Sequence, residues 1–501
     1  MPSIALEKET PGTGVLPRQW IGLAAGVALA LLVRTLLPDT LESGDKNVAA
    51  VATLMAVWWM TEALPLPATA LVPLVAFPAL DVAPIGVVAP PYANPVIFLF
   101  MGGFIIAIAM QRWNLHTRFA LATVSVVGTS PVRMIGGFML ATAFLSMWIS
   151  NTATAVMMLP IGIAVLGLMA QLGDGQRDPN FATALMLGIA YAASIGSLGT
   201  VIGTPPNTLL RGYADENLDI RISFFQWMQF GVPIAAVFLV IAWLVLTKVA
   251  FRPRITEVSG GRELIQERRR ELGPIGRAEW TVLAVFVFAA VSWMVMPQLA
   301  DVWEWAGLID DGVIAMTAAL LLFALPVTAD RRQRSLEWED TKNLPWGILL
   351  LFGGGLSLSG QFTRETEDGS TVGLGPWIGD RVTGLDVWPT VLLVFAVGLL
   401  VLLLTELTSN TATTATFLPI MAGVAGGLGL DPMLLLLPVA LAATCAFMLP
   451  VATPPNAVVF GSGQVTIAQM IRGGVLLNMI GVVLVTFAVY TLGIIVFGIS
   501  L

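Results

Sequence analysis

Long apolar segments separated by short polar connections fill the sequence from Trp20 to its end. An α-helix needs about 20 apolar residues to cross a hydrocarbon core about 30 Å thick. The pattern predicts apolar segments at residues 20–37, 48–64, 65–80, 95–110, 134–172, 182–210, 225–250, 280–297, 312–326, 345–360, 387–428, 432–460 and 471–498. Such a succession is typical of an all-α polytopic membrane protein embedded in a lipid bilayer.

Two of these segments are too long for a single crossing. Segments 134–172 and 387–428 each extend over about 40 residues and carry the triplet Ser-Asn-Thr near the middle. A helix that enters the membrane, turns and returns needs this length, so we predict two re-entrant hairpins. The other segments then count as about eleven transmembrane helices. An odd number places the two termini on opposite sides of the membrane.

Composition confirms the membrane class, and the distribution of charge indicates which connections between the segments are cytoplasmic. The chain is 56% hydrophobic and 11% charged, with a mean hydropathy of +0.85, far from a soluble domain. Most of the 25 Lys and Arg residues fall on one set of connections, which the positive-inside rule makes cytoplasmic. We therefore expect a cytoplasmic N-terminal tail, residues 1–19, and an outside C-terminus.

Three further features of the composition complete this picture. The stretch RELIQERRREL, residues 262–272, alternates basic with acidic side chains, which favours a solvated connector helix over a lipid-binding site. The net charge of −7 gives no indication of a nucleic-acid partner. The single Cys445 allows no disulfide within one chain.

Landmarks recur in the same order in the two halves of the chain. SMWISNTATAVMMLPIG, residues 146–162, returns as TELTSNTATTATFLPIM, residues 405–421, with a proline at the same distance after each asparagine. Upstream, FMGGF is echoed by FGGG, and downstream GTPPN is echoed by ATPPN, each about 250 residues later. Internal repetition of this kind indicates duplicated structural units.

The repetition predicts the domain organisation. A first transmembrane helix and a first repeat occupy residues 20–250, a cytoplasmic connector 251–279 and a second repeat 280–501. On the layout derived from charge, the first hairpin enters from the cytoplasm and the second from outside. The repeats are therefore inverted, which is a recurring plan of secondary transporters.

Each polar triplet lies where a hairpin tip would leave backbone groups unpaired, which a membrane tolerates only beside protein or a water-filled cavity. Ser and Thr hydroxyls and the Asn amide both donate and accept hydrogen bonds. The helix after the triplet also presents its positive N-terminal end. Each tip can therefore face a cation with oxygens and an anion with N–H and O–H groups. The alternative is that the triplets only bridge packed helices, and the repeated association with a helix break argues against it.

Paired prolines predict a break in segments 182–210 and 432–460. Pro205–Pro206 and Pro454–Pro455 remove consecutive backbone donors and force the preceding threonine toward extended geometry. Carbonyl oxygens freed around residues 199–203 and 449–452 are suitable Na⁺ ligands. A cation site and an anion site would then share one patch in each repeat.

Other titratable residues carry weaker hypotheses. Glu62 and Glu406 would each cost about 2.5 to 3.5 kcal/mol at the membrane centre without a partner, so pairing with helix ends or polar groups is favoured over a role in coupling. His116 is interpreted as a solvated loop residue. Asp310 and Asp311, at a helix boundary, are interpreted as outer-surface charges or a cap.

Together, SNTAT and TSNTAT, the paired TPPN breaks and the early stretch TEALPLPATALVPL resemble the divalent anion/sodium symporter family, which includes dicarboxylate, citrate and sulfate transporters. The resemblance extends from about Val48 to the end of the sequence. It implies a homodimer with a fixed scaffold domain and a mobile transport domain that carries substrate by an elevator motion.

The resemblance also implies the ligands of each site. One Na⁺ site is implied at Ser146, Ser150, Asn151 and Gly199, and a second at Thr405, Ser409, Asn410 and Ala452. The substrate is implied to lie at Asn151, Thr152, Asn410 and Thr411, with Thr200, Thr453 and Pro454 beside them. Since neither motif contains Arg or Lys, a bound dianion would need nearby cations and helix ends for compensation, and substrate affinity should depend on Na⁺.

The expected function is a sodium-coupled symporter of C4 dicarboxylates such as succinate, malate or fumarate in the inner (plasma) membrane. A sodium-independent dicarboxylate exchanger and a sodium-coupled transporter of citrate or sulfate remain open, because hydroxyl and amide groups suit any oxyanion. An intramembrane enzyme using Glu62, Glu406 or Asp310 and Asp311, and a passive channel, are further alternatives. The sequence shows no Ser-His or Cys-His pairing, metal-ligand cluster or phosphate loop. At least two Na⁺ sites are expected, and an electrogenic symporter would need more than two Na⁺ per dianion.

Overall fold

The structure, a computed structural model, describes residues 17–127, 130–172, 178–255, 261–300, 302–328, 333–365, 371–381, 384 and 387–500. Regular structure in these residues is helical apart from one short antiparallel hairpin, β1 (Arg364–Glu365) with β2 (Thr371–Val372). The elements of the first half are α1 (Pro17–Leu36), α2 (Ser43–Thr61), α3 (Leu66–Thr69), α4 (Val72–Ala79), α5 (Ile85–Val88), η1 (Pro90–Ala93), α6 (Pro95–Arg112), α7 (Leu115–Val127), α8 (Pro131–Ser146), α9 (Asn151–Leu172), α10 (Pro179–Ser197), α11 (Pro205–Leu218), α12 (Phe224–Leu244) and η2 (Val245–Ala250). Those of the second half are α13 (Gly261–Glu271), α14 (Arg277–Ala300), η3 (Glu304–Leu308), α15 (Asp311–Ala324), η4 (Trp338–Asn343), α16 (Trp346–Ser359), α17 (Leu374–Arg381), α18 (Thr390–Thr405), α19 (Asn410–Gly427), α20 (Met433–Thr444), α21 (Pro454–Gly461), α22 (Ile467–Ala488), η6 (Val489–Gly493) and α23 (Ile494–Phe497).

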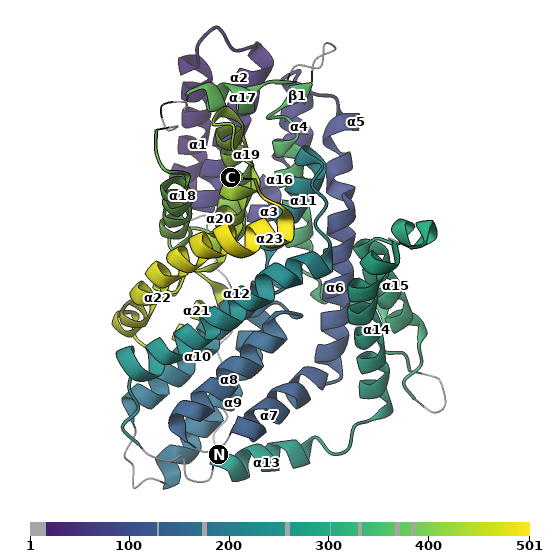
Figure 1. Ribbon diagram of the computed structural model, residues 1–501, viewed down its shortest axis with the longest axis vertical. Helices are drawn as coiled ribbons and strands as arrows, with labels where there is room; N and C mark the ends of the chain where they lie inside the picture. The colour runs from purple at the N-terminus through teal and green to yellow at the C-terminus, as the bar shows by residue number, and fades with distance from the viewer. Residues whose placement is uncertain are drawn as a thin grey trace.

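Apolar helices dominate this elongated molecule, with α2 and α17 near one end and α9 and α13 near the other (Figure 1). Six stretches in the described part of the chain are long and apolar enough to cross a membrane: Gln19–Leu36, Ile85–Arg112, Pro179–Ser197, Phe224–Ala250, Arg277–Ala300 and Ile467–Phe497. Shorter apolar helices form the first hairpin, the first arm of the second hairpin and the first part of the second broken helix. A nearly all-helical fold is thus confirmed, whereas the count of eleven crossings stays a prediction.

Each expected hairpin is a helix-turn-helix with its triplet at the turn. In the first hairpin, α8 ends at Ser146 and α9 begins at Asn151. In the second hairpin, α18 ends at Thr405 and α19 begins at Asn410, with the Ser409 hydroxyl accepting a hydrogen bond from a first-turn N–H. Ser, Thr and Asn are favoured at helix N-termini because they satisfy N–H groups that the helix leaves unpaired. The triplet therefore starts the returning helix.

Both expected broken helices are interrupted before their paired prolines. Residues 198–204 separate α10 from α11, and residues 445–453 separate α20 from α21. The backbone is extended at Thr204, with φ −147° and ψ 145°, and at Thr453, with φ −137° and ψ 147°. A residue before proline is driven to this geometry by collision with the proline ring.

One asparagine after each proline pair ties its break together. Asn207 donates from Nδ2 to the carbonyl oxygens of Ser197 and Thr200, at 3.1 and 2.9 Å. Asn456 makes the corresponding bonds at 3.2 and 3.0 Å, again to carbonyls 10 and 7 positions earlier. Both asparagines are fully buried. The TPPN motif therefore builds the same loop twice.

The two repeats exchange their contacts in space. Helix α11 of the first repeat packs against α19 and α20 of the second, and α21 of the second packs against α9 and α10 of the first. Helices α12 and α22 each continue into a short π-helix, η2 and η6. Two related halves that face each other would give this exchange, while their opposite orientation in the membrane stays a prediction.

The first departure from prediction is α7, which lies where a loop is expected and packs against α8. Its 13 residues mix apolar and polar positions and fall short of a membrane crossing, so the pattern misses it. His116 is buried on α7, with Nδ1 2.8 Å from the Met110 carbonyl oxygen, and its interpretation as a solvated residue is wrong. Burial lowers the pKa of His116, although the Met110 hydrogen bond acts in the opposite direction.

Helix α17 lies in another predicted connection and packs against α19 through glycines on both helices. A Cβ atom on Gly427 would lie 2.1 Å from Cα of Gly379, and one on Gly423 would lie 2.8 Å from the Gly375 carbonyl oxygen. Small residues permit such backbone contact between helices. The predicted connector helix is present as α13, with residues 266–271 exposed.

Asp310 and Asp311 have different roles. Asp310 caps α15, since its Oδ1 accepts the Val313 N–H at 2.8 Å, as predicted for a cap. Asp311 is buried, so its interpretation as an outer-surface charge is wrong. Its Oδ2 lies 2.8 Å from Nη2 of Arg211 on α11 and accepts the Phe224 N–H at 2.8 Å. One carboxylate therefore joins α11, α12 and α15.

We expect Arg211→Met to lower the free energy of unfolding by about 3 to 5 kcal/mol, because it leaves the Asp311 carboxylate buried without its cation. The double variant R211M/D311N should recover most of this loss, since no uncompensated charge remains. Arg221→Met is the matched control, because Arg221 is exposed and 3.8 Å from Asp215, and we expect a change below about 0.5 kcal/mol. Unfolding in detergent measures all three, and equal losses in R211M and R221M would contradict the assignment.

Candidate binding site between the hairpin tips

A cavity of about 1220 Å³ lies between the two hairpin tips and the two breaks. Its lining includes the tip residues Ser150, Asn151, Thr152, Ser409, Asn410 and Thr411, and the break residues Gly203, Thr204, Pro205, Ala452, Thr453 and Pro454. Segments far apart in the sequence meet here because α11 and α21 cross between the repeats. The fold thus brings both triplets and both breaks to one place.

Local hydrogen bonds orient the first tip. The Ser150 hydroxyl accepts a first-turn N–H at 3.2 Å, and Asn151 Oδ1 accepts the Thr152 N–H at 2.8 Å. Behind the tip, the Ser146 hydroxyl donates to a carbonyl of α10 at 2.5 Å. No described residue accepts a hydrogen bond from Asn151 Nδ2. The first tip therefore presents amide donors toward the cavity.

The second tip gathers three oxygens. Thr405 Oγ1 lies 2.7 Å from Asn410 Oδ1 and 3.0 Å from the Ala443 carbonyl oxygen, so its one proton serves one acceptor at a time. A hydroxyl, an amide oxygen and a backbone carbonyl are the hard oxygen ligands that alkali and alkaline-earth cations take. The Thr411 side chain lines the cavity beside them. Oxygens for a cation and donors for an anion thus occur within one turn.

Four of the predicted site residues lie behind the cavity lining, and all four are buried: Ser146, Gly199, Thr200 and Thr405. The Thr200 hydroxyl donates to the Met147 carbonyl and so ties the first break to the first tip. For Ser146, Thr200 and Thr405, hydrogen bonds to backbone carbonyls match the alternative that polar residues bridge helices. The other predicted residues face the cavity, and their role in binding stays a prediction.

Residues outside the predicted set also face the cavity at the first break, among them Gly203, Thr204 and Pro205. These three correspond to residues 452–454 when the two breaks are aligned on their paired prolines. This register was the signal in the sequence that could have found them. Which of the first-break residues bind a ligand stays a prediction.

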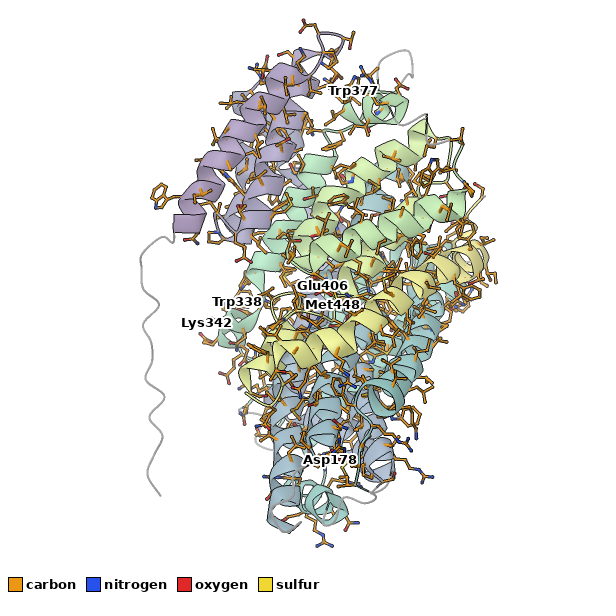
Figure 2. All side chains as sticks on the ribbon, turned by 90° about the vertical axis from the view of Figure 1, so that its left-hand side faces the viewer. Asp178, Trp338, Lys342, Trp377, Glu406 and Met448 are labelled. Carbon is orange, nitrogen blue, oxygen red and sulfur yellow. The ribbon has the colours of Figure 1, made fainter. Side chains whose placement is uncertain are left out.

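The Glu406 carboxylate holds the second break against the second tip. It is 2% exposed and accepts the N–H groups of Phe447, Met448 and Leu449 at 2.9, 3.0 and 3.1 Å. The Asn478 amide of α22 donates a further bond at 2.5 Å, and Figure 2 shows Glu406 next to Met448 near the middle of the molecule. Several donors compensate a buried charge, so the structural interpretation of Glu406 is confirmed.

The two tips differ in charge at this position. Four residues before Asn410 stands Glu406, whereas four residues before Asn151 stands Met147. The Met147 side chain packs where a Cβ on Gly199 would lie, at 3.1 Å. The second tip therefore holds a fixed negative charge that the first lacks.

Few charged side chains face the cavity. In the described part of its lining they are Glu62, Arg112 and Asp340. Glu62 is exposed at the end of α2 in a left-handed conformation, φ 49°, and its carboxylate has no partner among the described residues, so the expectation of a partner is wrong. Arg112 is paired with Asp340, which leaves a formal charge of −1. A dianion here meets no unpaired basic group and needs cations for compensation.

Comparison with known proteins agrees with this description of the fold. The crystal structure of the Alcanivorax borkumensis YdaH transporter superposes with a TM-score of 0.57 at 15% sequence identity, covering 88% of this chain and 98% of that one. The two chains therefore share a fold.

Sequence comparison then gives the family. The family described as the sodium:sulfate symporter transmembrane region matches residues 17–499. The sodium-dependent dicarboxylate transporter SdcS of Staphylococcus saprophyticus is 41% identical over 95% of this chain and 91% of its own length. SdcS of Staphylococcus aureus (strain USA300) is 42% identical over 96% and 93%. The chain belongs to the sodium:sulfate symporter family, as the resemblance implied.

Glu406→Gln is expected to lower the free energy of unfolding by about 1 to 3 kcal/mol, because an amide NH₂ would face backbone N–H groups that lose their acceptor. Glu62→Gln is the matched control at the exposed rim, with an expected change below about 0.5 kcal/mol. Thermal unfolding in detergent gives both values. A loss of the same size in the two variants would show that Glu406 does not hold the break.

Proposed function

We propose that this protein is a sodium-coupled symporter of C4 dicarboxylates such as succinate, malate or fumarate across the cytoplasmic membrane, and neither an enzyme nor a passive channel. One observation carries the proposal: both triplets face a single cavity whose charged lining sums to −1. The names of the Staphylococcus relatives support sodium dependence and the dicarboxylate class.

The anion would be held by neutral donors. Asn151 and Thr152 approach from one side and Asn410 and Thr411 from the other, with Thr453 beside them. Both α9 and α19 begin at these asparagines, so their N-terminal N–H groups and partial positive charge point to the same space. Two carboxylates of one small molecule fit two such ends.

At least two Na⁺ ions would complete the charge balance. The first would be bound by Ser146, Ser150 and Asn151 with a carbonyl of the first break, for which Gly199 is the expected residue. The second would be bound by Thr405, Ser409, Asn410 and Ala452, and the Thr405 and Asn410 oxygens already lie 2.7 Å apart. Each bound cation makes the binding free energy of the neighbouring anion more favourable, so cation and anion binding are cooperative.

An elevator motion would move this site across the membrane. The family resemblance that implies this motion also implies a homodimer. The hairpins, the broken helices, α12 and α22 would form the transport domain, and α2, α6, α14, α15 and α16 would belong to the scaffold. The two parts meet at glycines, because a Cβ on Gly103 of α6 would lie 3.1 Å from Ile202, and one on Gly355 of α16 would lie 3.4 Å from Ala415. Small residues permit close approach at these contacts, whereas the buried pair of Arg211 on α11 and Asp311 on α15 would have to rearrange when the parts move.

The cavity would open toward the cytoplasm in this state. Its rim holds Glu62, Gln111, Arg112, Asp340 and Asn343, and these lie on connections that the positive-inside layout assigns to the cytoplasmic side. The N-terminus would then be cytoplasmic and the C-terminus outside.

Sulfate is the second candidate substrate, since the family description names it and the same hydroxyl and amide donors suit a tetrahedral oxyanion. A competition assay distinguishes a dicarboxylate substrate from sulfate. Excess unlabelled succinate should abolish uptake of labelled succinate, whereas excess sulfate or citrate should leave most of it. The reverse ranking would replace the dicarboxylate assignment.

In proteoliposomes, we expect an inward Na⁺ gradient to drive uptake of labelled succinate, and replacement of Na⁺ by K⁺ or choline to abolish it. Asn151→Ala and Asn410→Ala should each reduce uptake to background, because each removes amide groups shared by an ion and the anion. Asn217→Ala is the matched control, since Asn217 bonds to Tyr213 away from the cavity, and it should transport normally. Equal uptake in choline would favour the exchanger, and near-normal uptake in both tip variants would refute the site.

Gly103→Leu should slow uptake by about tenfold, because overpacking at the contact with Ile202 costs roughly 1 to 3 kcal/mol when the domains move. Sodium-dependent succinate binding in detergent should change little. Gly167→Leu on α9 is the control, since an added Cβ there meets nothing within 4 Å. Loss of binding together with uptake in G103L would indicate a damaged site and not an impeded motion.

A further inference from the structure

One basic side chain faces the cavity in the described part of its lining, that of Arg112. It is the last residue of α6, and its side chain is 24% exposed. A guanidinium is the group that best matches a carboxylate, through two parallel N–H···O bonds. An arginine in a cavity for dicarboxylates is therefore expected to bind them, unless something prevents it.

Two acidic residues occupy this arginine. Nη1 of Arg112 forms an ion pair with Asp340 Oδ2, and Nη2 lies 3.4 Å from Glu337 Oε1. Its guanidinium also lies over the Trp113 ring, 5.8 Å from the centroid. Its donors thus face protein groups, and the cluster of one cation with two anions has a formal charge of −1.

Asp340 is held in place independently of Arg112. Its Oδ2 accepts the Glu337 N–H at 2.8 Å, as one half of a capping box at the start of η4. The Trp113 indole donates to the Ser335 carbonyl at 2.8 Å and fixes α6 against the same segment. The acceptor is therefore preorganised, and the arginine is bound without ordering a flexible loop.

We infer that Asp340 is a positioning residue that makes anion binding dependent on Na⁺, because it keeps Arg112 from compensating the charge of the dianion. This inference rests on the proposed function and adds a determinant of its coupling. If Arg112 were unpaired, a dicarboxylate could occupy the cavity with fewer cations. With Arg112 neutralised, the cations at the tips are the remaining source of positive charge beside the helix ends.

The segment η4 offers a matched control. Glu339 is an exposed acid of the same segment, next to Asp340 in the sequence, and is absent from the cavity lining. Its neighbours Trp338 and Lys342 lie at the edge of the molecule in Figure 2. Glu339→Gln therefore removes the same charge as Asp340→Asn, without releasing Arg112.

The test measures binding of labelled succinate to the purified full-length protein as a function of Na⁺ concentration, at constant ionic strength with choline. Asp340→Asn should lower the Na⁺ concentration for half-maximal binding by about fivefold, the lower end of typical coupling between sites, and should leave measurable binding in choline alone. E339Q should have the same Na⁺ concentration for half-maximal binding as the wild-type protein. The double variant R112M/D340N should return to the Na⁺ dependence of the wild-type protein, because the guanidinium that D340N releases is absent from it.

Several outcomes would overturn the inference. The inference fails if succinate binding depends on Na⁺ in D340N as it does in E339Q. It also fails if R112M/D340N keeps the lower Na⁺ requirement of D340N. If size-exclusion chromatography shows that D340N does not fold, Glu337→Gln replaces it, with a smaller shift in the same direction expected and no shift counting against the inference. Absence of any Na⁺-dependent succinate binding in the unchanged protein would overturn the proposed function itself, whereas Na⁺-dependent binding that D340N leaves unaltered would overturn only the role of Asp340.

Discussion

Backbone polar groups that open in the interior of an apolar protein must find partners, because lipid offers none and an unsatisfied group costs several kcal/mol. Two hairpin turns and two helix breaks create this demand at the centre of the molecule. The buried amides of Asn207 and Asn456 meet part of it by bonding to carbonyls across their own loops. Glu406 meets another part by accepting three backbone N–H groups.

Polar groups at the same place that have no partner within the protein are available to bind ligands. Donors of the triplets and oxygens of the tips face one cavity, so the interior that cannot be closed by helices is where charged ligands would be received. The two halves supply equivalent loops but unequal charge, since a carboxylate stands in the second tip where a methionine stands in the first. Two sites built from one motif therefore need not bind their cations with equal affinity.

The sequence was sufficient for the local structure of the site, because its signals are local. A proline pair breaks a helix, and a Ser-Asn-Thr triplet starts one, whatever the surroundings. It was insufficient where partners come from distant elements. The sequence around Asp311 does not indicate that its partner is Arg211, and the sequence around Glu406 does not indicate that its partner is Asn478. At the first break, the resemblance implies Gly199 and Thr200, whereas alignment of the internal repeat gives Gly203 and Thr204. Only the latter two line the cavity among these four residues.

The glycine contact between α17 and α19 has a mechanical consequence. Backbone lies against backbone at Gly379 and Gly427, so no layer of side chains exists across which the two helices could slip, and they behave as one rigid lever. Upstream of α17, Arg364 of β1 is anchored to Asp45 of α2 by an ion pair of 2.5 Å. If the second hairpin is displaced relative to α2, α17 would therefore move with it, because the contact between α17 and α19 leaves no room for slip.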